Sequence, residues 1–363
     1  MDPITEIKHI YIQREIRNHP KTRRIIDKLN CSISYIDEIS DVPSHYFDKK
    51  KSLILASQQG DFIKECPCTP HYLGCKYHVV ELAVGCLYDC TYCYLQQYQN
   101  IFATTFYVNF EDMYREFEQL LASDPDRIFR VGFGEYADSL FLDDILNYTQ
   151  EISKHLSQMK SQNYLIEYKT KSNNINNLLR FKPTGHEVVG WSLNAQTISE
   201  NEEKFAGNIV NRLTAMKKCV NQGYFVAVHF DPLVYFDGWE VEYLNIINQL
   251  FDNIDKKRIL WISIGSLRFN PGLKPIIEYR HPESKIVATE LIKGVDNKMR
   301  YPKVIRKKLY SQIVDFIKKR DPSAFIYFCM EDKDIWLDVL GKQVEEDEDI
   351  GMLFKKQVMK CFK

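Results

Sequence analysis

Three cysteines stand close together in the chain, and their spacing suits a metal or an iron–sulfur cluster. Cys86, Cys90 and Cys93 form a C-x3-C-x2-C pattern directly after an apolar run of strand length, His78–Val84. Thiolates bind both zinc and iron–sulfur clusters. A structural zinc site needs a fourth Cys or His at matching spacing, and the loop has none. Three thiolates without a fourth ligand can hold an iron–sulfur cluster that has one iron left open. Zinc and three buried free thiols are the alternatives.

The whole chain has ten cysteines, and the expected compartment decides how they are interpreted. The N-terminus, Met1–Arg24, is polar and charged, so it does not resemble a secretory signal. No run of about 18 apolar residues occurs, so no membrane-spanning helix and no membrane partner are expected. We therefore expect a cytoplasmic protein, in which cysteines are thiols or ligands rather than disulfides.

The charges of the chain almost cancel, with 48 Lys and Arg against 49 Asp and Glu. A balanced chain has no global positive field that would attract nucleic acid. Any nucleic-acid partner must therefore bind at a local basic groove. The sequence does not indicate an oligomeric state.

Apolar runs of strand length alternate with helix-like segments through the middle of the chain. Such alternation predicts an α/β fold with parallel strands and right-handed crossovers. Six units suit an incomplete (β/α)6-type barrel, and a doubly wound open sheet is the alternative. The expected strands are His78–Val84, Ile128–Phe133, Tyr164–Tyr168, Glu187–Leu193, Tyr224–Phe230 and Arg258–Ile264. The expected helices are Phe110–Ala122, Asp143–Gln158, Ile175–Arg180, Glu200–Asn221 and Trp239–Asn253.

The regularity of the pattern divides the chain into three parts. Residues 1–75 form an N-terminal segment with less regular patterning, and residues 76–271 form the partial barrel. Residues 272–363 form a C-terminal extension expected to complete the site. The extension carries a basic segment, Lys298–Lys308, then a helix at Ser311–Lys319 and a last strand at Ala324–Cys329.

The cysteine triplet is identified as that of the radical S-adenosylmethionine (SAM) superfamily. The resemblance implies a [4Fe-4S] cluster held by Cys86, Cys90 and Cys93, whose open iron is chelated by SAM. It also implies that an electron, supplied by a donor such as flavodoxin or ferredoxin, cleaves SAM to a 5′-deoxyadenosyl radical. That radical abstracts hydrogen from the substrate. The expected fold is then a radical SAM barrel with extensions at both ends.

Further segments resemble one family within this superfamily, the spore photoproduct lyases. That family acts on a thymine dimer lesion in DNA, 5-thyminyl-5,6-dihydrothymine. The matching segments follow one another in order from about residue 76 to residue 330. They are Cys90–Gln96, Thr104–Asn109, Thr170-Lys171, Trp191–Ala195, Gly223-Tyr224, Asp231–Tyr235, Gly238–Glu240 and Arg300-Tyr301.

The resemblance assigns expected roles to single residues. Tyr92 and Tyr94 would relay a hydrogen atom back to SAM, and Tyr92 would also contact the cofactor. Lys171, Ser192 and Asn194 would bind SAM. The alternatives are packing around the cluster for the tyrosines and ordinary strand-end or turn roles for the other three.

Two residues of the basic segment would meet the substrate. Arg300 would contact a phosphate or carboxylate, and Tyr301 would stack on or hydrogen-bond a base. The alternative is a plain basic surface segment.

One feature of the family is missing. The lyases carry a hydrogen-donor cysteine just past the second strand, and here Glu135 stands at that position. A carboxylate does not readily donate a hydrogen atom. Gly132–Glu135 instead resembles the superfamily's Gly-Gly-Glu motif, in which the glutamate accepts hydrogen bonds from the SAM ammonium. Tyr136 is a candidate replacement donor.

Three more cysteines, Cys66, Cys68 and Cys75, lie in one loop before the barrel. Their C-x-C-x6-C spacing is not a usual ligand pattern, so structural thiols are favoured over a metal site.

Three functions remain in competition. The leading hypothesis is a spore photoproduct lyase-like radical SAM enzyme, a carbon–carbon lyase that acts on a pyrimidine lesion in DNA. The first rival is an enzyme of the same family with another nucleotide, RNA or small-molecule substrate. The second rival is an iron–sulfur protein without SAM turnover.

Overall fold

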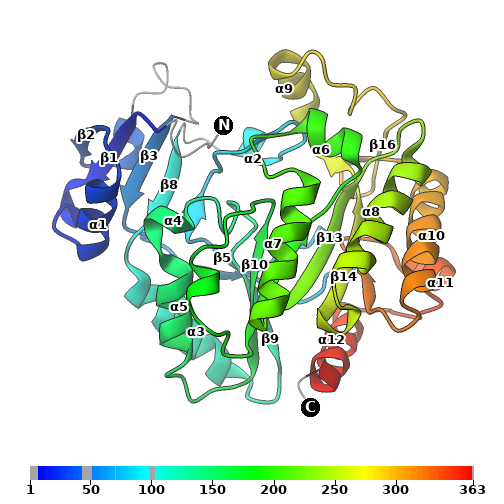
Figure 1. The fold of residues 1–363 in the computed structure, drawn as a ribbon. Helices are drawn as coiled ribbons and strands as arrows, with labels where there is room; N and C mark the ends of the chain where they lie inside the picture. Colours follow the sequence, from blue (N-terminus) through cyan, green and yellow to red (C-terminus); the bar gives the residue numbers. More distant parts are fainter. Residues whose placement is uncertain (1–6, 43–50, 70, 99–102, 362–363) are drawn as a thin grey trace.

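The computed structural model describes residues 7–42, 51–69, 71–98 and 103–361. Its main sheet has eight strands, and all neighbours are parallel except the first pair. The sheet curls into a half-barrel whose end strands do not pair with each other (Figure 1), which confirms the incomplete barrel. In spatial order the strands are β4 (Ile63–Glu65), β5 (His78–Val80), β9 (Phe129–Gly132), β10 (Tyr164–Thr170), β11 (Glu187–Ser192), β13 (Phe225–Leu233), β14 (Ile259–Ser266) and β18 (Ile326–Phe328).

Helices cover the outer face of this sheet (Figure 1). They are α3 (Phe110–Ser123), α5 (Tyr148–Leu156), α7 (Ile209–Gln222), α8 (Trp239–Asn253) and α10 (Lys303–Arg320). Because β11 is covered on both faces, all six of its residues are buried, and its middle four, Val188–Trp191, are apolar. The ends of α7 show how the sequence sets its limits. The Asn208 side chain accepts a hydrogen bond from the amide of Asn211, and Gly223 ends the helix with φ +109°.

Three helix predictions are wrong. The expected helix at Asp143–Gln158 is divided at Asn147, whose φ is +56°, into α4 (Asp143–Leu146) and α5. The expected helix at Glu200–Asn221 is divided into α6 (Gln196–Glu202), a two-residue strand β12 (Glu203–Lys204) and α7. The break turns the Glu203 carboxylate inward onto Arg212, and no continuous helix would bring the two together in this way. The expected helix at Ile175–Arg180 is only a single 3-10 turn, Leu178–Arg180.

The first 75 residues are more regular than their sequence pattern indicates. They contain β1 (His9–Gln13), α1 (Pro20–Lys28), β2 (Ser32–Ile36) and β3 (Ser52–Ala56). These strands form a second sheet, in the order β2-β1-β3-β8-β6, with β8 (Thr104–Tyr107) and β6 (Ala83–Val84). Since β6 and β8 flank the cysteine loop, this sheet supports the loop from one side. The domain boundaries stay a prediction.

The C-terminal part packs against the far edge of the main sheet. It contains a small sheet of β15 (Arg268–Phe269), β16 (Ile292–Lys293) and β17 (Met299–Arg300), together with α9 (Leu273–Arg280), α11 (Lys333–Leu340) and α12 (Asp347–Cys361). The predicted last strand is β18, and the predicted helix at 311–319 begins earlier, at Lys303. Among the described residues, no helix has both the length and the apolar character needed to cross a membrane.

Candidate active site

The cysteine loop follows β6 and runs into the short helix α2 (Leu95–Tyr98). The loop begins at Gly85, whose φ of +97° is a conformation that favours glycine. The Gly85 amide donates a hydrogen bond to the main-chain oxygen of Tyr136 at 2.8 Å. Within the loop, β7 (Asp89–Cys90) pairs with β12 of the α6–α7 connection. The loop is therefore tied to the segments that follow β9 and β11.

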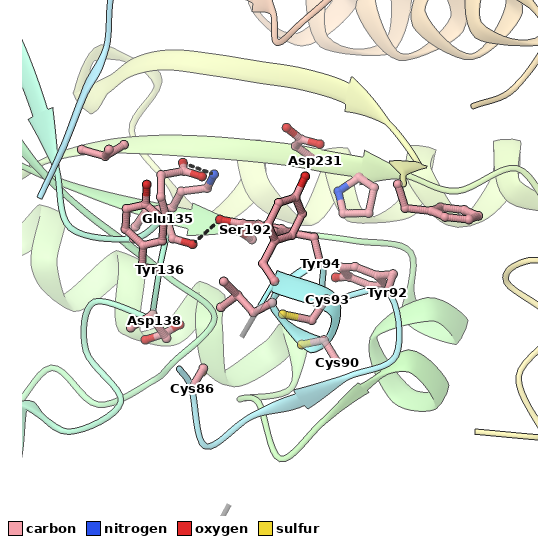
Figure 2. A pocket seen from close by; sticks show the side chains of 18 of the residues that line it. Cys86, Cys90, Tyr92, Cys93, Tyr94, Glu135, Tyr136, Asp138, Ser192 and Asp231 are labelled. Atoms are coloured by element: carbon pink, nitrogen blue, oxygen red, sulfur yellow. Dashed lines mark hydrogen bonds and ion pairs between the residues drawn. The ribbon is translucent and has the colours of Figure 1, made fainter. Parts of the chain in front are cut away.

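All three cysteines of the triplet line one cavity of about 650 Å³. Figure 2 shows Cys90 and Cys93 side by side, with their sulfur atoms turned to the same side, and Cys86 on the segment below them. The opposite side of the cavity is formed where strands β9, β10, β11, β13, β14 and β18 end. This is the end of a parallel sheet at which α/β proteins bind ligands, and the volume suits a drug-sized molecule.

Burial is the main influence on the thiol of Cys90. None of the three forms a disulfide. Burial raises the pKa of Cys90, Lys171 opposes the shift, and Glu203, Cys93 and Cys86 add smaller rises. In the part of the chain that the structure describes, no three Cys, His, Asp or Glu side chains converge to enclose a single metal ion. The preference for structural thiols at Cys66, Cys68 and Cys75 stays a prediction.

Tyr92 and Tyr94 both line the cavity. The Tyr92 hydroxyl donates to a carboxylate oxygen of Glu203, and the Lys171 ammonium lies 5.7 Å from the centre of its ring. The Tyr94 hydroxyl donates to the main-chain oxygen of Glu135 at 2.6 Å. Burial raises the pKa of both phenols well above the ordinary value. Both therefore keep their O–H hydrogen at neutral pH.

The Glu135 carboxylate is already partnered. It forms an ion pair with Lys169 at 3.3 Å, drawn as a dashed line in Figure 2. Burial lowers the pKa of Lys169, but Glu135 and Asp231 outweigh it and raise the pKa, so the lysine stays charged. Gly134 makes the close approach possible, because a Cβ there would lie 2.5 Å from Lys169 Cβ. The sequence analysis missed Lys169.

The residues expected at SAM divide into two groups. Lys171 and Ser192 line the cavity. Asn194 does not: it is buried behind the cavity, where its amide nitrogen donates to Pro232 O at 3.2 Å and its oxygen accepts from the Tyr243 hydroxyl at 2.6 Å. Asn194 thus fixes the chain around Asp231-Pro232, so any effect on a ligand is indirect.

Arg300 and Tyr301 are not brought to the cavity. Arg300 pairs with Asp296 at 2.5 Å and lies 3.9 Å over the ring of Tyr72. The Tyr301 hydroxyl accepts a hydrogen bond from the amide of Tyr235 at 3.0 Å. Both side chains are buried and neither lines the cavity, so their contact with a substrate stays a prediction.

Several lining residues were given no role from sequence. Asp231 and Arg268 form a two-pronged ion pair at 3.0 and 3.1 Å, and both line the cavity. Asp138 is buried and accepts from the amide of Lys171 at 2.6 Å, so it holds the end of β10. Asp231 lies in one of the segments that resemble the family, which was the available sign. No local pattern marks Arg268.

Comparisons with known proteins agree with this geometry. A family model described as spore photoproduct lyase matches residues 71–328. The spore photoproduct lyases of Geobacillus sp. and Bacillus subtilis are each 24% identical, over 218 and 217 residues. These alignments cover 58% and 59% of this chain, and 62% and 63% of the two relatives, which is less than two thirds of their length.

Solved structures give the same picture of the fold. A substituted spore photoproduct lyase with dinucleoside spore photoproduct superposes with a TM-score of 0.78, at 20% identity, over 89% of this chain and 98% of that one. A doubly substituted form with bound AdoMet and the same dinucleoside gives the same values.

Proposed function

This chain belongs to the spore photoproduct lyase family, and on that basis we propose that it is a radical SAM enzyme that acts on a pyrimidine lesion in DNA. One observation carries the proposal. The cysteine triplet, both interleaved tyrosines and the ends of six parallel strands line a single cavity. A cavity of about 650 Å³ has room for a cofactor and part of a substrate together.

In this proposal Cys86, Cys90 and Cys93 hold a [4Fe-4S] cluster. A cluster spreads three thiolates over three of its irons, so cysteines along one side of a wide cavity suit it better than a single ion. With SAM on the fourth iron, the bound pair supplies a 5′-deoxyadenosyl radical. Burial disfavours the Cys90 thiolate, and binding to iron removes that penalty, since a coordinating thiol is deprotonated outright.

The remaining residues bind and orient SAM. Lys171 is placed to attract its carboxylate, and the Glu135 carboxylate to accept from its ammonium in exchange for, or together with, Lys169. Ser192 offers a hydroxyl at the end of β11, and Asn194 holds the neighbouring turn. Tyr92 and Tyr94, kept as neutral phenols, hold O–H hydrogens that can be exchanged with a nearby radical.

The DNA lesion is proposed from the relatives. Two solved structures carry dinucleoside spore photoproduct, one of them together with AdoMet. Lys298 gives the cavity a positive side chain that can face phosphate, whereas Lys169 and Arg268 are already paired with Glu135 and Asp231. The proposal includes a cytoplasmic location and an electron donor such as flavodoxin or ferredoxin.

The test is anaerobic reconstitution with iron and sulfide, then reduction with dithionite in the presence of SAM, with and without the dinucleoside lesion. We expect 5′-deoxyadenosine in both mixtures and loss of the lesion in the second. If 5′-deoxyadenosine forms but the lesion persists, the substrate assignment fails and the rival with another substrate replaces it. If the loaded protein forms no 5′-deoxyadenosine, the enzyme proposal fails and the non-catalytic iron–sulfur protein replaces it.

A further inference from the structure

A second group of cysteines lies beside the cavity, apart from the triplet. Cys66, Cys68 and Cys75 are on the loop that joins the strands β4 and β5, and Cys329 directly follows β18. Strands β4 and β18 are the two ends of the main sheet, so these cysteines come from its opposite edges. In sequence Cys329 is far from the other three, and the fold is what brings it to them.

Main-chain pairing brings Cys68 and Cys75 together. Strands β4 and β5 are antiparallel, and their ladder continues with the Cys66 amide, which donates to Tyr77 O at 2.7 Å. Followed two residues further, this register sets Cys68 opposite Cys75. A Cβ on Gly74, next to Cys75, would lie 3.2 Å from the Cys68 sulfur. The two sides of the loop therefore approach each other closely at these cysteines.

A second pairing brings Cys75 to Cys329. Leu73 forms an antiparallel bridge with Glu331, and the Leu73 amide donates to Glu331 O at 3.2 Å. Followed two residues along, this register sets Cys75 opposite Cys329. The loop thus joins the two edges of the half-barrel that do not pair with each other, and Cys75 has Cys68 on one side and Cys329 on the other.

The acidities of the thiols agree with this arrangement. Burial is the main cause that raises the pKa of Cys66, of Cys68 (to about 11) and of Cys329. In all three Cys75 adds a smaller rise, and Cys329 adds one at Cys66. The charge of one sulfur therefore acts on the others, as expected for thiols that lie near one another. None of the four forms a disulfide.

Positive side chains lie against this group. The Arg268 guanidinium is 3.4 Å from the Cys329 sulfur. Burial raises the pKa of Cys329, and Arg268 and Lys169 oppose the rise. Arg268 opposes it at Cys68 as well, and Lys169 at Cys66. The site therefore combines four sulfur ligands with cations that offset negative charge on them, and an N–H donor beside a sulfur is one of the features that tune an iron–sulfur centre.

The arrangement of the sulfurs distinguishes between metals. Thiolates select zinc, copper(I) and iron–sulfur clusters. A single zinc ion needs its sulfurs to converge at about 2.3 Å from one point. Among the described residues, no three side chains of the ligand types converge in this way. A four-iron cluster takes each thiolate on a different iron, so it suits cysteines that are neighbours without meeting at one point.

We propose that Cys66, Cys68, Cys75 and Cys329 bind a second iron–sulfur cluster, a [4Fe-4S] centre with a protein thiolate on every iron. Because no iron is left open, this centre does not bind SAM, which separates it in kind from the cluster proposed at the triplet. Cys66 also lines the cavity, so the second centre lies at the wall of the cavity that holds the triplet. The inference depends neither on the lesion nor on cleavage of SAM.

The test is metal analysis of the protein after anaerobic reconstitution with iron and sulfide. The wild type should contain about eight irons and about eight acid-labile sulfides per chain, because it binds two four-iron clusters. The triplet variant, Cys86→Ala/Cys90→Ala/Cys93→Ala, should keep about four of each. Its reduced form should give an electron paramagnetic resonance signal that SAM does not change.

The reverse variant removes the second site. Cys75→Ala/Cys329→Ala should also keep about four irons, and its signal should still respond to SAM. The matched control is Cys31→Ala, a cysteine between α1 and β2, which should hold as much iron as the wild type. Circular dichroism shows whether the double variant is folded. If it is not, the triplet variant decides, because it leaves all four cysteines of the second site in place.

The outcomes separate this inference from the proposed function. If the wild type holds about four irons and the triplet variant none, the second cluster does not exist and the proposed function stands. If the wild type and the triplet variant both hold about four, the second cluster is present and the proposed function fails. About one zinc per chain, lost in Cys75→Ala/Cys329→Ala and found in place of the second set of irons, would overturn the assignment of an iron–sulfur centre.

Discussion

Replacing Arg212 with leucine is expected to destabilise the fold by about 3–5 kcal/mol, because it leaves a charge buried without its partner. The Arg212 guanidinium lies 2.6 Å from the Glu203 carboxylate, and the two side chains are 0% and 1% exposed. Solvent therefore cannot take over the role of the arginine. Arg212 also donates to the main-chain oxygens of Gly207 and Ser192, at 2.5 and 3.0 Å, so the lost donors add to the cost.

The pKa of Glu203 determines how the stability loss in Arg212→Leu changes with pH. Burial raises the pKa of Glu203, but Arg212 and Lys171 outweigh it and lower the pKa. A lowered carboxyl pKa contributes stability above the unfolded value, and that stability is lost as pH falls through the folded value. In Arg212→Leu burial dominates and the pKa rises, so acid relieves the buried charge. The stability gap between wild type and variant should therefore narrow between pH 7 and pH 5.

The assay is chemical denaturation followed by circular dichroism at several pH values. The double variant Arg212→Leu/Glu203→Gln should recover at least about 1 kcal/mol relative to Arg212→Leu alone, because the unpaired charge is gone. The control is Lys319→Met, which removes an exposed pair with Asp315 and should cost at most about 0.5 kcal/mol. A loss below about 1 kcal/mol for Arg212→Leu, with a gap that does not change with pH, would refute the reasoning.

Two further predictions concern β11 and the end of β10. Gly190→Ala would place a Cβ 2.3 Å from a carboxylate oxygen of Glu167, and should lower the free energy of unfolding, measured by denaturation, by about 1–3 kcal/mol. The control is Gly351→Ala on α12, where the added Cβ meets nothing within 4 Å and should raise the free energy of unfolding by up to about 1 kcal/mol. Equal effects of the two would contradict the close approach at β11. Lys171→Met should weaken SAM binding by about 10- to 100-fold in calorimetry of the reconstituted protein, whereas Lys204→Met, outside the cavity, should leave it unchanged. Unchanged affinity in Lys171→Met would remove the lysine from the SAM site.

Much of the fold could be predicted from sequence, because buried parallel strands are nearly continuous apolar runs. Val188 to Trp191 illustrate this, since every residue is buried on both faces of the sheet. The division of α6 from α7 could not be predicted in this way. At the break Glu203 forms an ion pair with Arg212 and β12 pairs with β7, and neither contact is visible in the local sequence pattern.

The candidate site was predictable where its residues are close together in sequence. The cysteine loop, Tyr92 and Tyr94 were found because one short segment carries them all. The sequence analysis interpreted Cys66 as a structural thiol. It lies far from the cysteine loop in sequence, and the pairing of β4 at the edge of the sheet brings it to the cavity. Arg300 was expected at the substrate, because a basic segment in sequence does not show that Asp296 neutralises it.

The central claim is that Cys86, Cys90 and Cys93 hold a four-iron cluster with one iron open to SAM. Electron paramagnetic resonance of the reduced, reconstituted protein, recorded with and without SAM, tests it most directly. We predict a cluster signal whose shape changes when SAM is added, and no SAM-responsive signal when all three cysteines are replaced by alanine. A SAM-responsive signal that persists in the triple variant, or a wild-type signal that SAM leaves unaltered, would contradict the account.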